Sequence, residues 1–215
     1  MSNKPYKGFE PKWLLTPAPA GSYRSIFRWG DPAFFKYPKE SLYKMMKEAF
    51  HMTDEDFRDY TDDIGFDQVS LPDHPSRIAP EHLEALKKIV GKEFVTTGDY
   101  ERLSVAYGCT GYDLLRLRHK QIDSLPDVVV YPDTTEQVEE LVRYAAEHKL
   151  PLYVYGGGSS VTRGVEPIKG GISLDMRKRF NKILSFNEVD QTITVQAGLS
   201  GPALEEALQD ALFFR

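Results

Sequence analysis

One segment of the chain limits its fold more than any other. It is a short apolar run that opens into three consecutive glycines and two serines: Tyr153-Val154-Tyr155-Gly156-Gly157-Gly158-Ser159-Ser160-Val161-Thr162-Arg163-Gly164. Three adjacent residues without a Cβ allow positive φ angles and let backbone N–H groups approach a ligand closely. Such a turn suits a phosphate, although a strand-ending turn that only needs flexibility has the same composition.

The residues before the glycines favour a ligand site. An apolar run at Asp127–Tyr131, an amphipathic helix at Glu136–His148 and a second apolar run at Leu152–Tyr155 precede them. This order indicates a βαβ unit with parallel strands, both faces buried, a right-handed connection and a capping box at Thr134–Gln137. The glycines then follow the carboxyl end of the second strand, where ligands of open α/β sheets bind.

The loop matches neither of the two common phosphate-binding motifs. Ser159, Ser160 and Val161 stand where a P-loop needs Lys followed by Ser or Thr. The dinucleotide motif places spaced glycines after the first strand, whereas these glycines are contiguous and follow the second. The sequence therefore indicates neither nucleoside-triphosphate hydrolysis nor an NAD site.

Five blocks in order resemble the FAD-binding domain of FAD-linked oxidases, a family that includes vanillyl-alcohol oxidase, D-lactate dehydrogenases and alkylglycerone phosphate synthase. They are Pro126–Pro132, Glu136–His148, Tyr155–Val161, Ile172–Met176 and Val195–Gly198. The resemblance implies an α/β fold with a mixed sheet and FAD as the cofactor. A hairpin between Lys182–Phe186 and Thr192–Ala197 and a helix after Gly201 are expected to follow.

The resemblance also places the FAD pyrophosphate on the loop at residues 154–161. Consecutive N–H groups can form an anion-binding nest there, and the two serine hydroxyls add donors. Val154 departs from the family, which usually has Pro at this position. The cofactor-binding residues it implies are Pro132, Val154, Tyr155, Gly156, Gly157, Gly158, Ser159, Ser160, Val161, Gly164 and Gly198.

Two expectations concern how the loop binds FAD. Some members attach the flavin covalently through a His in this loop, but this chain has Ser159 there and no His or Cys nearby, so non-covalent FAD is expected. Replacing Gly157 by Val should abolish flavin binding and leave the fold intact, because a β-branched residue resists positive φ.

The resemblance covers the N-terminal portion of longer enzymes, so we divide the chain into a helical and irregular region at 1–125 and an incomplete first FAD-binding subdomain at 126–215. No catalytic residue is assigned, since those residues should lie beyond Arg215. The 215 residues alone are expected to be catalytically silent and to bind FAD weakly or not at all.

The region before residue 126 shows two helical patterns, at Ser41–Phe50 and Pro80–Val90. The apolar stripe of the first is predicted to be core: Leu42, Met45, Met46, Ala49 and Phe50. Prolines and aromatics in Met1–Tyr37 indicate an extended arm that packs on the rest. Basic residues at 116–120 either attract a phosphate or complement a helix end, and the second interpretation is favoured.

Ser25–Asp31 and Asp99–Arg118 resemble alkylglycerone phosphate synthases, although an aromatic anchor would explain the first segment equally well. This favours an enzyme that exchanges an acyl for an alkyl chain on dihydroxyacetone phosphate. An oxidoreductase of 2-hydroxy acids and a non-catalytic folded fragment stay open as alternatives.

The composition limits which binding partners and which cellular compartment are expected. A net charge of −5 argues against nucleic acid and anionic membranes. Cys109 is the only cysteine, which excludes an internal disulfide, favours a cytoplasmic setting and is more typical of a small buried residue than of a nucleophile. No apolar run is long enough to span a bilayer, and no histidine spacing indicates a metal. A small-molecule substrate and a homodimer of the full-length protein are expected.

Overall fold

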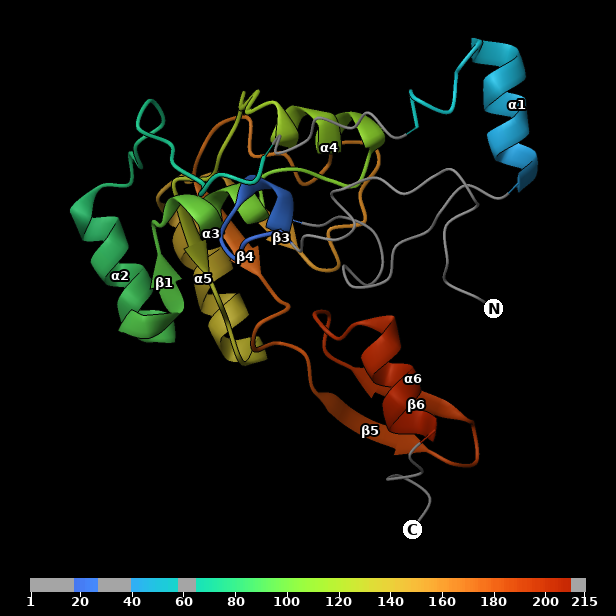
Figure 1. Ribbon diagram of the computed structural model, residues 1–215. Helices are drawn as coiled ribbons and strands as arrows, with labels where there is room; N and C mark the ends of the chain where they lie inside the picture. The colour runs from blue at the N-terminus through green and yellow to red at the C-terminus, as the bar shows by residue number, and fades with distance from the viewer. Residues whose placement is uncertain (1–17, 27–39, 58–64, 210–215) are drawn as a thin grey trace. The chain divides into compact units, whose positions relative to one another are not determined.

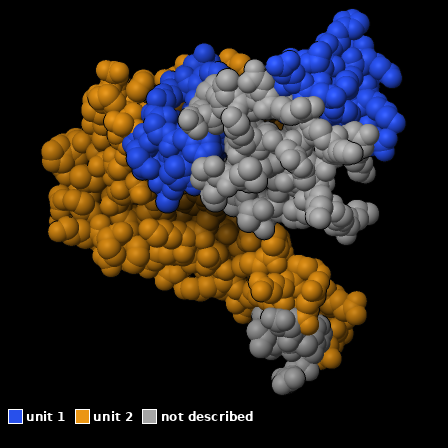
Figure 2. All heavy atoms as spheres, viewed as in Figure 1, with its two compact units in different colours: residues 1–69, 114–121 blue, residues 70–113, 122–215 orange. Residues whose placement is uncertain are grey.

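The computed structural model describes residues 18–26, 40–57 and 65–209 (Figure 1). The chain divides into two compact units, which Figure 2 colours separately: Met1–Val69 with Leu114–Gln121, and Ser70–Asp113 with Ile122–Arg215. The division of the chain after residue 125, made from the sequence, marks where the FAD-binding subdomain is expected to begin. It does not refer to these compact units, and it stays a prediction. Most of the arm predicted for Met1–Tyr37, with its Arg28-Trp29 pair, lies outside the described residues.

The first unit contains the short helix η2 (Tyr23–Ser25), helix α1 (Glu40–Phe50) and most of helix α4 (Gly111–Arg118). Helix α1 is confirmed, but the prediction that its apolar stripe is core is wrong: Leu42 is 43% and Phe50 68% exposed. Tyr43 is the buried residue instead. Its ring packs on Phe57 at a centroid distance of 4.5 Å and its hydroxyl donates to the Asp54 carboxylate, so the buried face is centred one residue later.

The second unit is built on a four-stranded sheet. Its order is β1 (Val95–Thr96), β2 (Val128–Val130), β4 (Ile172–Asp175), β3 (Leu152–Tyr155). Strands β2, β4 and β3 are mutually parallel, and β1 is antiparallel to β2. The predicted mixed α/β fold is confirmed, although one strand of the sheet precedes residue 126.

The position of β4 corrects one detail of the predicted βαβ unit. Strands β2 and β3 are parallel but do not pair with each other, because β4 lies between them and pairs with both. Strand β2 is buried on both faces, as predicted, whereas β3 lies at the edge of the sheet and Val154 is 53% exposed. The expectation that both strands are buried on both faces is therefore wrong for β3.

Two helices supply the core on one face of the sheet. Leu86 of α2 (Pro80–Val90) and Leu141 of α5 (Thr135–Glu147) are fully buried against Val128 and Leu174. The bounds of α2 are those predicted, and α5 starts one residue earlier than predicted. Because α2 and α5 pack together, the Nδ1 of His82 on α2 lies 2.8 Å from the Tyr144 hydroxyl oxygen on α5.

The start of α5 fixes the chain just after β2. Thr134 is its N-cap and its hydroxyl accepts from the Gln137 N–H at 3.3 Å. The reciprocal bond of a capping box reaches one residue further back, because the Gln137 side chain accepts from the Asp133 N–H at 2.8 Å. The predicted cap thus also fixes Asp133, three residues after the end of β2 at Val130.

The last elements form a separate sheet. Strands β5 (Ile183–Asn187) and β6 (Thr192–Val195) pair antiparallel, and α6 (Gly201–Gln209) follows, which confirms the predicted hairpin and helix. Within the described ranges, no helix is both long enough and apolar enough to cross a membrane.

Candidate functional site

The glycine-rich loop Gly156–Val161 begins where β3 ends at Tyr155. Of its three glycines, only Gly158 has a positive φ, at 64°. A Cβ on Gly158 would also lie 2.1 Å from the Tyr155 hydroxyl. Glycine is therefore required at 158 both for the left-handed backbone and for the space that Tyr155 occupies.

Gly157 differs from its neighbour in both respects. Its φ is not positive, and a Cβ built on it would meet no atom within 4 Å. The argument that valine fails at Gly157 because φ must be positive is therefore wrong. An added side chain there would project into open space, so it would obstruct only a ligand that approaches the loop.

The backbone donors of the loop are available to a ligand. Among the residues that the structure describes, none accepts a hydrogen bond from the N–H groups of Gly156–Val161. Gly157, Ser159 and Val161 are exposed residues, whereas Gly158 between them is buried, so one side of the loop faces solvent. A run of successive N–H groups without an acceptor is the arrangement that binds anions.

Two carbonyls of the loop are bonded to one residue, Cys109. Its thiol donates to the Gly158 carbonyl at 2.7 Å, and its N–H donates to the Ser160 carbonyl at 2.8 Å. Cys109 is 3% exposed, which agrees with its prediction as a small buried residue. The contact itself has no signal in the sequence, since 49 residues separate Cys109 from Gly158.

A fixed positive charge lies beside the loop. Arg177 places its guanidinium carbon 4.5 Å from the ring centroid of Tyr155 and donates to both oxygens of Asp175, at 2.9 and 2.7 Å. Burial is the largest single influence and opposes the charge on Arg177, but the hydrogen bonds that Arg177 donates to Asp175, together with the negative charge of Asp175, raise the pKa of the guanidinium. Lys178 lies 4.3 Å from the ring centroid of Tyr131. The sequence analysis missed both; three basic residues after the strand Ile172–Asp175 were the available signal.

The other predicted contacts lie at the same end of the sheet. Pro132 is buried just beyond β2. Gly198 packs against the chain after β4, since its Cβ would lie 2.0 Å from the Met176 carbonyl oxygen. A Cβ on Gly156 would lie 3.4 Å from the oxygen of the adjacent Ala197, so the loop and Gly198 are neighbours. No described contact joins Pro132 to the loop.

A hydrogen bond between Gly164 and Ser160 fixes the C-terminal end of the loop. The Gly164 N–H donates to the Ser160 hydroxyl oxygen at 3.1 Å. Because that oxygen accepts, the Ser160 hydroxyl proton is still able to donate to a ligand. Val154 and Val161 are 53% and 57% exposed, which leaves apolar surface on both sides of the donors.

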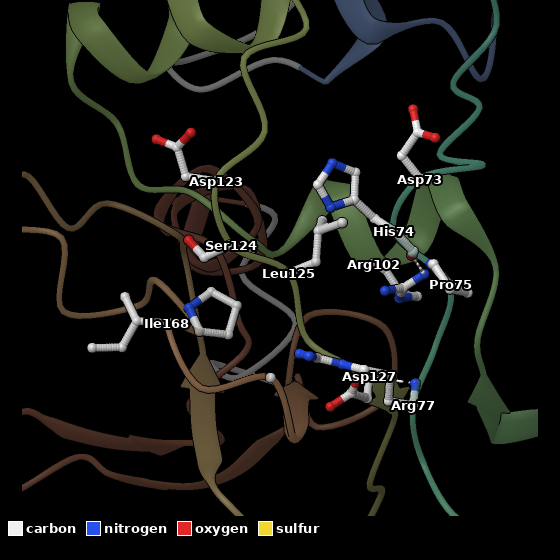
Figure 3. Close-up of a pocket in the computed structure, with 12 residues that line it drawn as sticks. Asp73, His74, Pro75, Arg77, Arg102, Asp123, Ser124, Leu125, Asp127 and Ile168 are labelled. Atoms are coloured by element: carbon white, nitrogen blue, oxygen red, sulfur yellow. Dashed lines mark hydrogen bonds and ion pairs between the residues drawn. The ribbon is translucent and has the colours of Figure 1, made fainter.

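A polar cavity of about 260 Å³ lies at the opposite, amino ends of the strands (Figure 3). Arg102 is buried there, and its Nε and Nη1 donate to the carbonyls of Pro126 and His74, both at 2.8 Å. Asp127 accepts from the N–H groups of Arg77 at 3.0 Å and Gly171 at 2.6 Å. Arg102 and Asp127 thus hold four segments of the chain together, so we interpret the cavity as a structural feature distinct from the loop.

The described part of the chain contains no group of three or more His, Cys, Asp or Glu side chains that could hold a metal ion. The distinctive chemistry of the site is therefore its run of backbone donors with Arg177 beside it. Such a site fits an anion with several oxygens.

Comparison with known proteins identifies the class of domain to which this part of the chain belongs. Residues 126–215 match the model of a family described as FAD binding domain. This part of the chain is a segment of an FAD-binding domain of mixed α/β fold, which confirms the recognition made from the sequence and implies FAD as the cofactor.

The chain is similar to two kinds of curated enzyme. It is 32% identical over 137 residues to alkyldihydroxyacetonephosphate synthase of Dictyostelium discoideum, covering 62% of this chain. It is 28% identical over 130 residues to the mitochondrial D-lactate dehydrogenase [cytochrome] 1 of Saccharomyces cerevisiae, covering 60% of this chain. The matched parts span 22% of the length of each of these relatives.

A solved structure supports the relation to the first kind. A structure of alkyldihydroxyacetonephosphate synthase matches with a TM-score of 0.60 and 31% identity, covering 64% of this chain and 27% of that one. The FAD-binding segment is therefore related to that of alkyldihydroxyacetonephosphate synthases.

Proposed function

We propose that the loop Gly156–Val161 binds the pyrophosphate of FAD. The observation that carries this proposal is that its six consecutive N–H groups lack an acceptor among the described residues, while the carbonyls of Gly158 and Ser160 are bonded to Cys109. A pyrophosphate offers several charged oxygens to such donors. Hydrogen bonds to a charged group contribute about 1.5–3 kcal/mol each.

Electrostatics supports the same assignment. Arg177 keeps its positive charge beside Tyr155, and its side chain is 40% exposed. Its charge is shared with Asp175, so its attraction for an anion is moderate and is screened further by water. The backbone donors therefore remain the main contribution to binding, and Arg177 and Lys178 add a favourable field.

FAD bound in this way is non-covalent in our proposal. The segment Gly156–Gly164 contains no His, Cys or Tyr. The nearby Cys109 thiol is buried and already donates to the Gly158 carbonyl. FAD supplies redox chemistry at its isoalloxazine ring, and the part of the protein described here orients the cofactor through its pyrophosphate.

The activity that we propose for the flavoenzyme is that of an alkyldihydroxyacetonephosphate synthase. Those enzymes are the more similar of the two kinds, with 32% identity over 137 residues against 28% over 130 residues for the yeast D-lactate dehydrogenase, and the solved structure with a TM-score of 0.60 is one of them. The second candidate, oxidation of a 2-hydroxy acid, is favoured by the similarity to the yeast D-lactate dehydrogenase. Assays with acyl-dihydroxyacetone phosphate plus a fatty alcohol, and with D-lactate plus a dye acceptor, distinguish the two.

The binding site is tested directly with a phosphate probe. Inorganic pyrophosphate, and separately FAD, is titrated into ¹⁵N-labelled protein while amide chemical shifts are followed, a measurement that also detects weak binding. We expect the largest shifts at the amides of Gly156–Val161. Shifts confined to other residues, or no shifts with millimolar ligand, would contradict the site.

A matched pair of variants locates the ligand on the loop. Gly157→Val places a side chain in open space above the donors and should abolish binding while the unfolding transition stays close to that of the wild type. Gly111→Val is the control, because a Cβ at Gly111 also meets no atom within 4 Å but lies at the start of α4. Equal binding by the two variants would reject the assignment.

A further inference from the structure

The segment Gly108–Cys109 contacts the glycine-rich loop from outside the region that matches the FAD-binding family. The Cys109 thiol donates to the Gly158 carbonyl at 2.7 Å, and the Cys109 N–H donates to the Ser160 carbonyl at 2.8 Å. A single residue therefore bonds two alternate carbonyls of the loop. The contact with Gly158 is buried.

These two bonds determine which groups the loop presents. A peptide carbonyl carries partial negative charge, so a carbonyl that faced the ligand would repel an anion and compete for neighbouring donors. With the carbonyls of Gly158 and Ser160 bonded to Cys109, none of the described residues accepts from the N–H groups of Gly156–Val161. Two of the loop's carbonyls are thus bonded to Cys109, while its N–H groups have no acceptor among the described residues.

Gly108 provides an independent observation of the same contact. A Cβ on Gly108 would lie 2.1 Å from the Ser160 carbonyl oxygen and 3.1 Å from its carbon. Both are backbone atoms, so the loop itself would have to move to accommodate a side chain. Glycine at 108 is required for close approach to the loop, and its φ is not positive.

The segment is held on both sides of the contact. Before it, Val105, Ala106 and Tyr107 have no exposed surface, and the Tyr107 hydroxyl accepts from the Asp123 N–H at 2.9 Å. After it, the Thr110 hydroxyl accepts from the Asp113 N–H at 2.9 Å at the start of α4. Gly108 and Cys109 therefore approach the loop from a fixed position.

We propose that Gly108 and Cys109 are positioning residues for the pyrophosphate-binding loop: Gly108 permits the close approach, and Cys109 occupies two of the loop's carbonyls so that its N–H groups face the cofactor. This inference rests on the proposed function, since it assigns both residues to the same site. Neither residue touches the cofactor. The Cys109 thiol serves as a hydrogen-bond donor and requires no change of oxidation state.

Three variants test the positioning role with inorganic pyrophosphate as the probe. Cys109→Ala removes the side-chain donor and should weaken binding about two- to tenfold, the loss of one hydrogen bond. Cys109→Ser restores a donor and should bind within about twofold of the wild type. Ala145→Gly, in the remote helix α5, is the control: it should lower the Tm without changing the affinity.

A second measurement, on the ligand-free protein, tests the positioning role of Cys109 separately from the proposal that the loop binds pyrophosphate. We expect ¹⁵N relaxation to show increased motion at Gly156–Val161 in Cys109→Ala and wild-type behaviour in Cys109→Ser. Unchanged relaxation and affinity in Cys109→Ala, or equal losses in the Ala and Ser variants, would overturn the positioning role. If the wild type bound no pyrophosphate, the proposed function and the positioning role that rests on it would both fail, and the relaxation data would still show whether Cys109 orders the loop.

Discussion

Arg177 lies over the ring of Tyr155, with its guanidinium carbon 4.5 Å from the ring centroid, while both oxygens of Asp175 accept its hydrogen bonds. Asp175 is the last residue of β4 and pairs in register with Tyr155, the last residue of β3. The hydroxyl of Tyr155 in turn occupies the space beside Gly158. Packing of the sheet is thereby connected to the shape of the loop.

The first prediction concerns this ion pair. Arg177→Met should destabilise the protein by about 1–3 kcal/mol, because it leaves the Asp175 carboxylate, 5% exposed, without its guanidinium. The cost is below that of a fully buried pair, since the Arg177 side chain is 40% exposed and water screens the interaction.

Urea unfolding measures the change. The control is Arg143→Met, which breaks a pair with Glu139 whose side chains are 69% and 68% exposed. That variant should change the free energy of unfolding by no more than about 1 kcal/mol. Equal effects in the two variants would show that Asp175 does not depend on Arg177.

The second prediction contrasts two adjacent glycines. Gly158→Ala should cost at least about 1–2 kcal/mol, because its φ of 64° is unfavourable for alanine and because Tyr155 must also move. Gly157→Ala should stay within about 0.5 kcal/mol of the wild type, since its Cβ meets no atom. Thermal or urea unfolding of the two variants measures the difference. A larger loss of stability in Gly157→Ala than in Gly158→Ala would contradict the backbone geometry of the loop.

The third prediction concerns the polar cavity at the amino ends of the strands. Arg102→Met removes charged donors from the carbonyls of Pro126, where the bond is buried, and His74, where it is half-buried, and should destabilise the protein by about 2–3 kcal/mol. Arg77→Met is the control, because 77% of that side chain is exposed and its N–H bond to Asp127 comes from the backbone. A loss of stability in Arg102→Met no larger than that in Arg77→Met would indicate that water replaces the lost donors.

The sequence predicted the elements that depend on local pattern. Apolar periodicity located α2 and α5, alternation located the hairpin of β5 and β6, and the five ordered blocks identified the FAD-binding segment. Periodicity carries no information on which strands become neighbours, so the position of β4 between β2 and β3 did not follow from it. The buried face of α1 was also missed, since Tyr43 is selected by contacts with Phe57 and Asp54 rather than by hydrophobicity.

The site was predicted less completely than the fold. The glycine run indicated a donor-rich loop, but only coordinates distinguish Gly158, whose φ is positive, from Gly157, whose φ is not. The contact of Cys109 with the loop joins residues far apart in the chain, and a lone cysteine is ordinarily a small buried residue. Arg177 was not identified because no motif marks it, although it lies two residues after the end of β4.

The last prediction concerns pH. The hydrogen bond from Lys182, at 2.7 Å, holds the pKa of Asp133 below its usual range, with smaller contributions from the charges of Lys182 and Arg179. A carboxyl whose pKa is lower in the folded state binds fewer protons there than in the unfolded chain, so folding stability rises with pH through this range. The contribution of Asp133 to stability is present above the unfolded pKa of about 3.9 and is lost as pH falls through the folded pKa.

Asp133→Asn should remove the contribution of Asp133 to the pH dependence of stability. Unfolding measured between pH 2 and 6 would show this as a smaller loss of unfolding free energy at acidic pH. Glu140→Gln, at an exposed position on α5, is the control and should keep the wild-type slope. A wild-type acid limb in Asp133→Asn would mean that the ion pair with Lys182 does not contribute to the stability of the folded protein.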